Sequence, residues 1–312
     1  MSEQGEQRTA WAPPDLAGVV ALVTGASRGV GRGIAAALGD AGATVYVTAR
    51  STRAGTRTEG LPGTVEETAE EVRRRGGVGV PVVCDHHEET QVEALFVQIE
   101  RERGHLDLLV NNAWSGYERY TDVRFDARFW EQPMWRWDQC AASLRGQFLA
   151  SRLATGLMLP RRAGLIVNVG FRDGDVYLGQ VGYDVCKLGS DRMVAGMAHE
   201  LRRHGVAAVA LHPGFVRTER VEVAWALLGD GPAQVVHSPE YVGRAVAHLA
   251  ADPDVLERSG AVLATGELAQ RYGFCDVDGR QPPPFRIEGR ITLAHRMARL
   301  GAIVEQARKE AS

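Results

Sequence analysis

Tyr183 and Lys187 lie four positions apart in a stretch that predicts a helix from Val181 to Arg203. Residues at this spacing project from one face of a helix. A tyrosine phenol has a pKa of about 10, too high for easy proton exchange at neutral pH. A neighbouring ammonium lowers that pKa and favours general acid/base chemistry. The pair makes Tyr183 and Lys187 candidate catalytic residues, although such a pair taken alone is more often an ordinary surface contact.

A second chemical feature is the glycine-rich segment TGASRGVG at residues 24–31. Its glycines permit a tight turn and let the backbone approach a pyrophosphate, which then faces free N–H groups and a helix dipole. A glycine cluster alone is weak evidence, but this one follows a predicted strand and opens a predicted helix. It therefore predicts a dinucleotide site, with cofactor contacts from Gly25, Ser27, Arg28, Gly29, Val30 and Gly31.

The choice of dinucleotide is indicated by the residues that follow the second predicted strand. A site selective for NAD would carry Asp or Glu there, to accept from the ribose 2′-hydroxyl. This chain has Ala49-Arg50-Ser51 instead, and Arg28 lies in the glycine-rich turn. Two guanidinium groups suit a 2′-phosphate, so the pattern favours NADP(H) as the cofactor. The alternative is that Arg50 is merely solvated at the end of a strand.

The elements that must position these residues alternate regularly between strand and helix. Strands are predicted at Val19–Thr24, Thr44–Thr48, Val78–Val83, Leu106–Val110, Leu165–Val169, Val206–Leu211 and Ala261–Thr265. Such alternation predicts an α/β fold, a doubly wound parallel sheet (Rossmann fold) of about seven strands in a single domain. We expect a flexible leader over 1–15, the Rossmann domain over 16–275, and an extension over 276–312. An amphipathic helix is predicted from Ile291 to Ala311, packed on the body or a partner subunit, with a membrane-surface role less favoured.

Several helix ends carry local signals. Thr64 with Glu67, and Thr90 with Glu93, have the spacing of capping boxes. Ser238-Pro239-Glu240 predicts another helix start, and Pro160 predicts the end of a long helix that begins near Trp135.

Composition excludes several classes of function. The 312 residues are 45% hydrophobic and 24% charged, with a net charge of −3 and no long basic block, so a nucleic-acid partner is not expected. No run of about 18 apolar residues predicts a membrane span. The first residues lack the apolar core of a signal peptide, so the expected location is cytoplasmic. Four scattered cysteines predict buried thiols and no metal site.

Two further motifs complete a constellation. Asn111-Asn112-Ala113 follows the fourth predicted strand, and the segment HPGFVRT at 212–218 follows the sixth. With the glycine-rich turn and the Tyr–Lys pair, in this order, they resemble the short-chain dehydrogenase/reductase family over residues 17–275. Segments at 144–146, 199–205 and 271–280 look like the subgroup of dehydrogenase/reductase SDR family member 1. The polar loop at 51–63 is similar to bacterial relatives.

The resemblance implies roles for several residues. Tyr183 would pass a proton to or from the substrate oxygen while hydride moves at the nicotinamide, and Lys187 would also hold the ribose hydroxyls. Asp85 would contact adenine, and Asn112 and Ala113 the ribose region of the cofactor. The segment after the sixth strand would contact the carboxamide and pyrophosphate through Pro213, Gly214, Val216 and Thr218. The resemblance also implies a homodimer or homotetramer, with the helices at 135–159 and 181–203 meeting across subunits.

Two positions depart from the family pattern. Gly170 stands where the family has a catalytic serine, and no Ser or Thr occurs between Gly164 and Tyr183 to replace it. Ser143 stands where a helix asparagine is usual. Removing a hydrogen-bond donor of this kind from a hydrolase costs about 10²–10³ in rate.

Four nearby residues are candidates to replace the serine. Arg172 or Tyr177 could donate directly, whereas Asp173 or Asp175 would need a raised pKa or a bridging water. A solvated loop is an equally good interpretation of all four.

Aromatic residues are dense between positions 114 and 137. They are Trp114, Tyr117, Tyr120, Phe125, Phe129, Trp130, Trp135 and Trp137. They would line a pocket for a flat or apolar substrate, or else pack helices at a subunit interface. Four arginines in the same segment (Arg119, Arg124, Arg128 and Arg136) leave room for an acidic ligand.

These features favour an NADP(H)-dependent oxidoreductase acting on a carbonyl or alcohol of a small aromatic or apolar metabolite. Two alternatives remain open. One is a repurposed family member that catalyses a non-redox step such as cyclisation, dehydration or isomerisation. The other is a non-catalytic nucleotide-binding protein.

Overall fold

The computed structural model describes residues 11–119, 122–171, 176–228 and 236–286. Its centre is a seven-stranded sheet in the order β3-β2-β1-β4-β5-β6-β9, with every neighbouring pair parallel. The strands are β1 (Val20–Thr24), β2 (Thr44–Ala49), β3 (Val78–Val83), β4 (Leu108–Asn111), β5 (Gly164–Val169), β6 (Val206–His212) and β9 (Val262–Ala264). The predicted parallel sheet of seven strands is confirmed, with strand ends within one or two residues of those expected.

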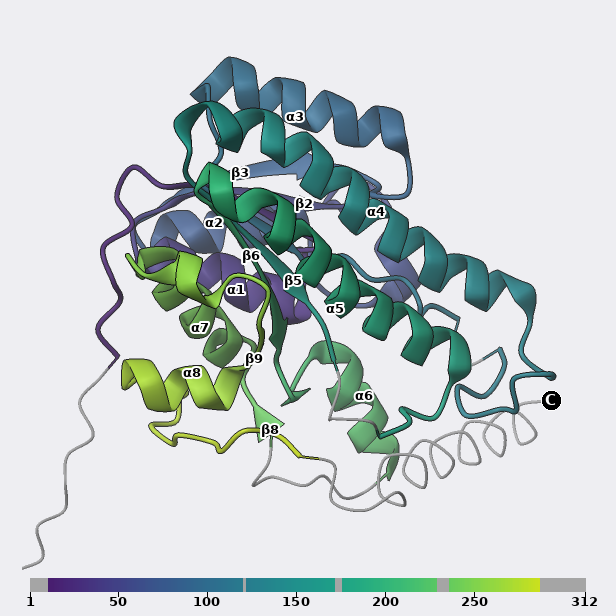
Figure 1. Cartoon of the computed structure of the whole chain (residues 1–312). Coiled ribbons are helices and arrows are strands. Elements are labelled where there is room, and N and C mark those ends of the chain that lie inside the picture. The colour runs from purple at the N-terminus through teal and green to yellow at the C-terminus, as the bar shows by residue number, and fades with distance from the viewer. Residues whose placement is uncertain (1–10, 120–121, 172–175, 229–235, 287–312) are drawn as a thin grey trace, which may run out of the picture.

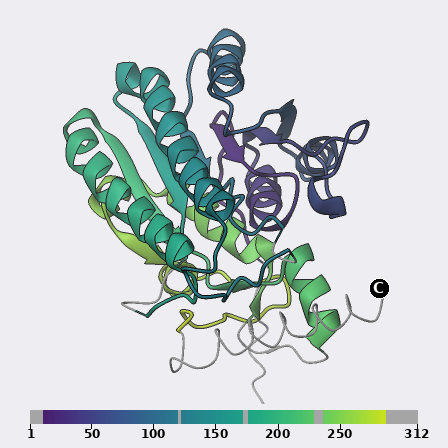
Figure 2. The ribbon, with the colours of Figure 1, turned by 90° about the vertical axis from the view of Figure 1, so that its right-hand side faces the viewer.

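Helices cover both faces of the sheet (Figures 1 and 2). One layer contains α1 (Gly29–Asp40), α2 (Val65–Arg74), α7 (Pro239–Ala251) and α8 (Thr265–Tyr272). The other contains α3 (Glu89–Arg103), α4 (Met134–Met158) and α5 (Val181–Leu201). Successive strand residues point to opposite faces, so Ala21 and Val23 join the first core while Val20 and Leu22 join the second. Strands buried on both faces explain the continuous apolar runs in the sequence.

Most local helix signals act as predicted. The Thr64 hydroxyl accepts from the N–H of Glu67 at the start of α2, and the Ser238 hydroxyl accepts from the N–H of Tyr241 at the start of α7. Helix α4 ends at Met158, and Pro160 lies in the 3₁₀ turn Leu159–Arg161 that follows.

The predicted cap at Thr90 is wrong, because α3 already begins at Glu89. The preceding turn explains the earlier start. The Asp85 carboxylate accepts from the N–H of His87, and the Gln91 side chain accepts from the N–H of Asp85. These contacts bring the chain into the helix one residue before the threonine.

Two helices and two short strands were not predicted. Helix α6 (Glu219–Leu228) follows β6, α8 follows β9, and the short strands β7 (Phe215–Val216) and β8 (Val236–His237) pair in parallel. The amphipathic helix predicted from Ile291 to Ala311, and most of the predicted leader, lie outside the described residues.

The cysteines of the chain are free thiols. Cys84, Cys140 and Cys186 are buried free thiols, and Cys275 is half-buried. Within the described ranges, no three His, Cys, Asp or Glu side chains gather into a potential metal site. None of the described helices is both long and apolar enough to cross a membrane.

The strand order reverses between β1 and β4. In open parallel sheets, ligands bind at the carboxyl ends of the strands beside such a reversal. The glycine-rich turn after β1 and Asn112-Ala113 after β4 flank this point. The fold therefore brings the predicted motifs to one edge of the sheet.

Candidate active site

The glycine-rich turn packs directly on the segment after β4. A Cβ on Gly25, whose φ is +65°, would lie 2.7 Å from the Ala113 Cα, and one on Gly31 would lie 2.5 Å from the Asn112 Nδ2. The Asn112 amide donates to the carbonyls of Thr24 at 2.9 Å and Gly25 at 3.0 Å. Larger residues at these glycines would separate the two segments. The structure thus brings together Gly25, Gly31, Asn112 and Ala113 as predicted.

The segment after β6 reaches the N-terminus of α1. The Thr218 methyl lies 3.3 Å from the position of a Cβ on Gly29, and the Gly29 N–H donates to the Glu219 carboxylate at 2.9 Å. A helix N-terminus attracts negative charge, so Glu219 marks an anion-binding position. The sequence analysis missed Glu219. Its one signal was an acidic residue directly after the Thr218 of the family motif.

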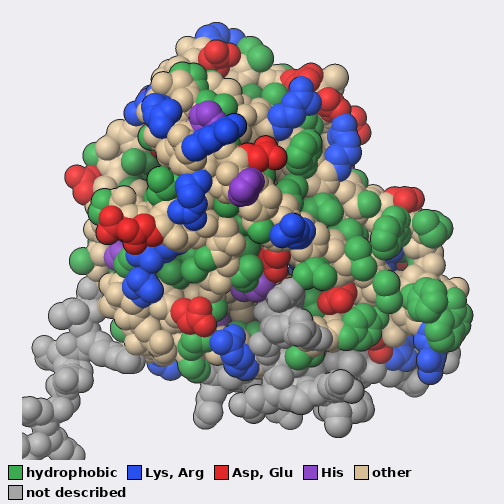
Figure 3. Space-filling view, in the orientation of Figure 1, with side chains coloured by type: hydrophobic (Ala, Val, Ile, Leu, Met, Phe, Trp, Pro, Cys, Tyr) green, Lys and Arg blue, Asp and Glu red, His purple; other side chains and the backbone are tan. Residues whose placement is uncertain are grey.

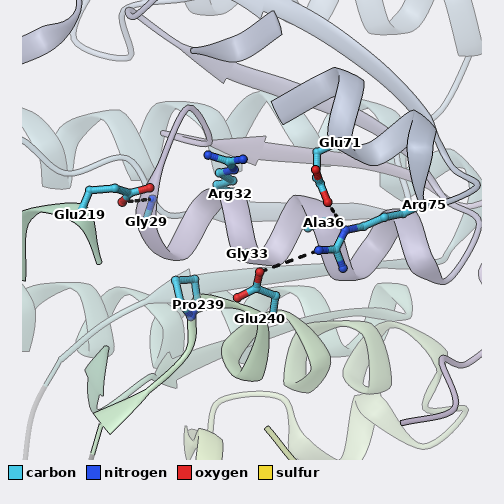
Figure 4. Close-up of a pocket in the computed structure, with 9 residues that line it drawn as sticks. All are labelled: Gly29, Arg32, Gly33, Ala36, Glu71, Arg75, Glu219, Pro239 and Glu240. Atoms are coloured by element: carbon cyan, nitrogen blue, oxygen red, sulfur yellow. Dashed lines mark hydrogen bonds and ion pairs between the residues drawn. The ribbon is translucent and has the colours of Figure 1, made fainter. Parts of the chain in front are cut away.

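Figure 4 shows Glu219 pointing at Gly29 beside α1. A hollow of about 290 Å³ runs along the outer side of this helix, past Arg32. At its far end Arg75 bonds to Glu71 and lies 3.9 Å from Glu240. Gly29, at the end of the glycine-rich turn, lines the hollow, whereas Tyr183 and Lys187 do not.

The residues after β6 that were predicted to contact the cofactor are packed against neighbouring elements. Gly214 has a φ of +83°, and a Cβ there would lie 2.6 Å from the His237 Nε2, so this turn requires glycine. Val216 is buried in β7, and the Thr218 carbonyl accepts from the N–H of Glu222 at the start of α6. Pro213 is buried beside Gly214.

Of the two arginines predicted to bind a 2′-phosphate, Arg50 directly follows β2, and Arg28 reaches the same place from the turn before α1. Arg28 donates to the Ser51 hydroxyl at 2.6 Å and to the Thr58 carbonyl at 2.9 Å. Arg50 pairs with Glu118 and lies 3.8 Å from Asp85. Partial burial lowers the pKa of Arg28, but a guanidinium stays protonated in proteins.

Lys187 is buried on the inner face of α5, one turn after Tyr183. Its ammonium donates to the Val169 carbonyl at 3.5 Å and lies 4.0 Å from the centre of the Trp114 ring. Burial lowers the pKa of Lys187 to about 8. These contacts direct the charge toward Trp114 and the end of β5.

Tyr183 is enclosed by an aromatic cluster of Trp114, Tyr117 and Phe125. Its ring centre lies 5.3–5.5 Å from the three others, and only 2% of Tyr183 is exposed. The Tyr117 hydroxyl donates to the Tyr183 hydroxyl at 2.6 Å. Burial, with a smaller effect from Tyr117, raises the pKa of Tyr183 well above its ordinary value.

The prediction of a lowered Tyr183 pKa is therefore wrong for the protein without ligands. Lys187 lies 5.7 Å from the Tyr183 ring centre and contacts Trp114 more closely, at 4.0 Å. The low-polarity surroundings disfavour the phenolate, and this effect dominates.

The other aromatic residues between positions 114 and 137 differ in their exposure. Phe129, Trp130 and Trp137 are exposed, and Tyr120 lies outside the described residues. The Trp135 ring lies under the guanidinium groups of Arg119 and Arg136, at 4.6 and 5.1 Å.

The nearby arginines already have partners inside the segment. Arg136 is fully buried and donates to the carbonyls of Val123 and Arg124. Arg119 pairs with Asp122, Arg124 pairs with Asp126, and Arg128 lies over Trp130. An acidic ligand is therefore not supported here.

The two departures from the family pattern have distinct surroundings. Ser143 is buried, and its hydroxyl lies 2.9 Å from the Ser115 hydroxyl and accepts from the Ser115 N–H. This contact holds Ser115, in the loop that carries Tyr117, against α4. Next to Gly170 lies His212, whose Nε2 is 3.0 Å from the Asp191 Oδ1.

Of the four suggested replacements for the serine, the structure describes only Tyr177. Tyr177 is 58% exposed, whereas Arg172, Asp173 and Asp175 lie outside the described residues. His212 and Asp191 were missed as site residues. The available signals were the position of Asp191 four residues after Lys187 and the histidine at the end of a strand.

Comparison with known proteins shows the family of the chain. The model for short chain dehydrogenases matches residues 19–226. The chain belongs to the short-chain dehydrogenase/reductase family. It is 44% identical over 278 residues to mouse (Mus musculus) dehydrogenase/reductase SDR family member 1, covering 85% of each chain.

Solved structures of other short-chain dehydrogenases are also similar. A putative dehydrogenase from Xanthomonas campestris matches with a TM-score of 0.71 and 27% identity, covering 88% of this chain and 99% of the other. A metagenomic short-chain oxidoreductase in complex with NADP matches with a TM-score of 0.61 and 28% identity, covering 77% and 93%. The resemblance stated from the motifs is confirmed, and with it the Rossmann-like fold.

The Tyr117–Tyr183 contact generates a prediction. The Tyr117 hydroxyl donates to the Tyr183 oxygen, so an alcohol substrate that donates to the same oxygen would displace it. Removing a hydrogen bond of about 1 kcal/mol changes an equilibrium about fivefold. Tyr117→Phe is therefore expected to lower KM by about this factor and to leave kcat unchanged in steady-state assays. A fall in kcat at constant KM would instead mean that Tyr117 acts in the transition state.

Proposed function

We propose that this protein is an NADP(H)-dependent oxidoreductase acting on a carbonyl or alcohol group of a small aromatic or apolar metabolite. The observation that carries the proposal is the convergence of the glycine-rich turn, Asn112-Ala113 and the Tyr183–Lys187 helix at one edge of the sheet. Membership of the short-chain dehydrogenase/reductase family supports the reaction class.

The residues present fit a nicotinamide dinucleotide. Gly25 and Gly29 add no side chains at their two positions of the turn, and the N-terminus of α1 holds a carboxylate that a pyrophosphate would replace. Arg28 and Arg50 supply the cations for a 2′-phosphate, while Lys187 would hold the ribose hydroxyls. When bound, the nicotinamide supplies or accepts the hydride.

The chain's own residues would then handle the proton. Tyr183 donates its proton to the substrate oxygen during reduction and takes it back during oxidation. Trp114, Phe125 and Leu178 keep water from the phenol. The same apolar walls support an aromatic or apolar group on the substrate. The Lys187 ammonium, 5.7 Å from the centre of the Tyr183 ring, is the positive charge that would stabilise the phenolate.

Tyr183→Phe is the direct test of this function. It keeps the aromatic packing and removes only the hydroxyl, so NADPH oxidation with a panel of ketones, quinones and aldehydes is expected to fall by about 10²–10⁴-fold. Tyr177→Phe is the matched control, because Tyr177 is exposed, and it should leave the rate unchanged. Product formation without NADP(H) turnover would favour a repurposed, non-redox member of the family.

Cofactor choice is tested at Arg50. Removing a hydrogen bond to a charged group costs about 1.5–3 kcal/mol, or about ten- to a hundredfold in affinity. Arg50→Ala is expected to raise the Kd for NADPH by that factor and to leave the Kd for NADH unchanged, as measured by fluorescence titration. Arg53→Ala is the control, since Arg53 pairs with Glu70 on the surface. Equal losses for both cofactors would contradict selection by the 2′-phosphate.

We also propose that the protein is a homodimer or homotetramer that associates through α4 and α5. Apolar side chains gather on the visible face over these helices (Figure 3), and Phe148, Val185 and Leu188 are each about half exposed. Such a patch on a soluble domain marks an association surface.

The association proposal predicts that Leu188→Glu produces a smaller species in sedimentation velocity. A charge buried in a subunit contact carries a large desolvation cost. Val97→Glu, on the exposed side of α3, should leave the assembly unchanged. Identical sedimentation of the Leu188 variant and the original protein would exclude this face.

A further inference from the structure

A buried histidine–aspartate pair lies beside the proposed active site and has no role in the mechanism so far. The His212 Nε2 is 3.0 Å from the Asp191 Oδ1, and the side chains are 10% and 7% exposed. The Asp191 Oδ2 is buried without a hydrogen-bond partner among the described residues. The His212 Nδ1 has no hydrogen bond within the described part of the chain, yet it is not among the fully buried polar atoms.

The imidazole fills the space that a side chain on Gly170 would need. Strand β5 pairs with β6, and the Gly170 N–H donates to the Leu211 carbonyl at 2.9 Å. A Cβ on Gly170 would lie 2.7 Å from both Cδ2 and Nε2 of His212, and 3.2 Å from the Asp191 Oδ1. Because real Cβ atoms do not approach this closely, glycine at 170 and the observed place of His212 depend on each other.

Asp191 lies on the same face of α5 as Tyr183 and Lys187. Tyr183, Lys187 and Asp191 follow one another at intervals of four residues, and all three are buried. Asp191 is close enough to Lys187 to raise its pKa against the larger effect of burial. Asp191 therefore joins the face that carries the proposed proton donor to the end of β6, where His212 lies.

We propose that His212, oriented by Asp191, is a second catalytic residue that hydrogen-bonds the reacting oxygen of the substrate next to Tyr183. This inference rests on the proposed function and deepens it. Asp191 accepts from Nε2–H, which fixes the ring and leaves Nδ1 for the substrate. Nδ1 accepts a hydrogen bond from an alcohol and, when the ring carries a second proton, donates one to a carbonyl oxygen.

His212→Gln is the central variant. The glutamine amide can keep the hydrogen bond to Asp191, but nothing replaces Nδ1. We expect kcat to fall by about 10²–10³-fold, the usual effect of losing one such group. The melting temperature and the Kd for NADPH should stay at the values of the original protein, because neither the fold nor the cofactor turn is altered.

Two further variants separate chemistry from packing. His212→Ala leaves a cavity beside Gly170. Added imidazole should raise the kcat of this variant at least tenfold. Gly170→Ser is expected to be impaired, because its Cβ meets the His212 ring. In the double variant Gly170→Ser/His212→Ala the space is free for the serine, and its hydroxyl should raise kcat at least tenfold above that of His212→Ala.

The outcomes distinguish this inference from the proposed function. Absence of NADPH-linked turnover by the original protein would overturn the proposed function and this inference with it. An active original protein whose kcat is unchanged by His212→Gln would overturn only the role of His212. The role of His212 would also be overturned if the loss of kcat in His212→Ala matched a loss of melting temperature, imidazole did not raise kcat, and the double variant was no faster than His212→Ala.

Discussion

The structure depends on the close approach of two turns at the carboxyl edge of the sheet. Gly25 and Gly31 leave room for Asn112 and Ala113 to touch the first turn, and the Asn112 amide bonds back to the carbonyls of that turn. The contact holds the end of β4 against the start of α1. Because β5 and β6 follow β4 in the sheet, the contact also sets where Gly170, His212 and the face of α5 lie relative to the glycine-rich turn.

The chain's own groups occupy the positions proposed for the substrate oxygen and the cofactor phosphates. The Tyr117 hydroxyl lies on Tyr183, the Glu219 carboxylate on the N–H of Gly29, and the Glu118 carboxylate on Arg50. Buried or half-buried polar groups need partners, and these contacts provide them. The two carboxylates match the charge of the phosphates proposed for those places, and the Tyr117 hydroxyl matches an alcohol substrate that donates to Tyr183. Binding would then exchange one satisfied contact for another.

Much of this could be predicted from the sequence, because local patterns determine it. The apolar runs gave the strands, and the glycines and the Tyr183–Lys187 spacing gave the motifs of the site. Contacts that depend on three-dimensional placement were missed. Tyr117 reaches Tyr183 across 66 positions of the chain, and His212 meets Gly170 only through the register of β5 and β6. The direction of the Tyr183 pKa shift was also mispredicted, since spacing along a helix does not reveal how deeply a phenol is buried.

Hydride transfer at this edge of the sheet is the step on which the proposed function depends. Its most direct test is isotope transfer, with NADPH carrying deuterium on either face of the nicotinamide C4 and an accepted carbonyl substrate. The account predicts that one of the two labelled cofactors gives an alcohol with a single deuterium on the new carbinol carbon, as measured by mass spectrometry. Product without deuterium from both labelled cofactors would contradict it.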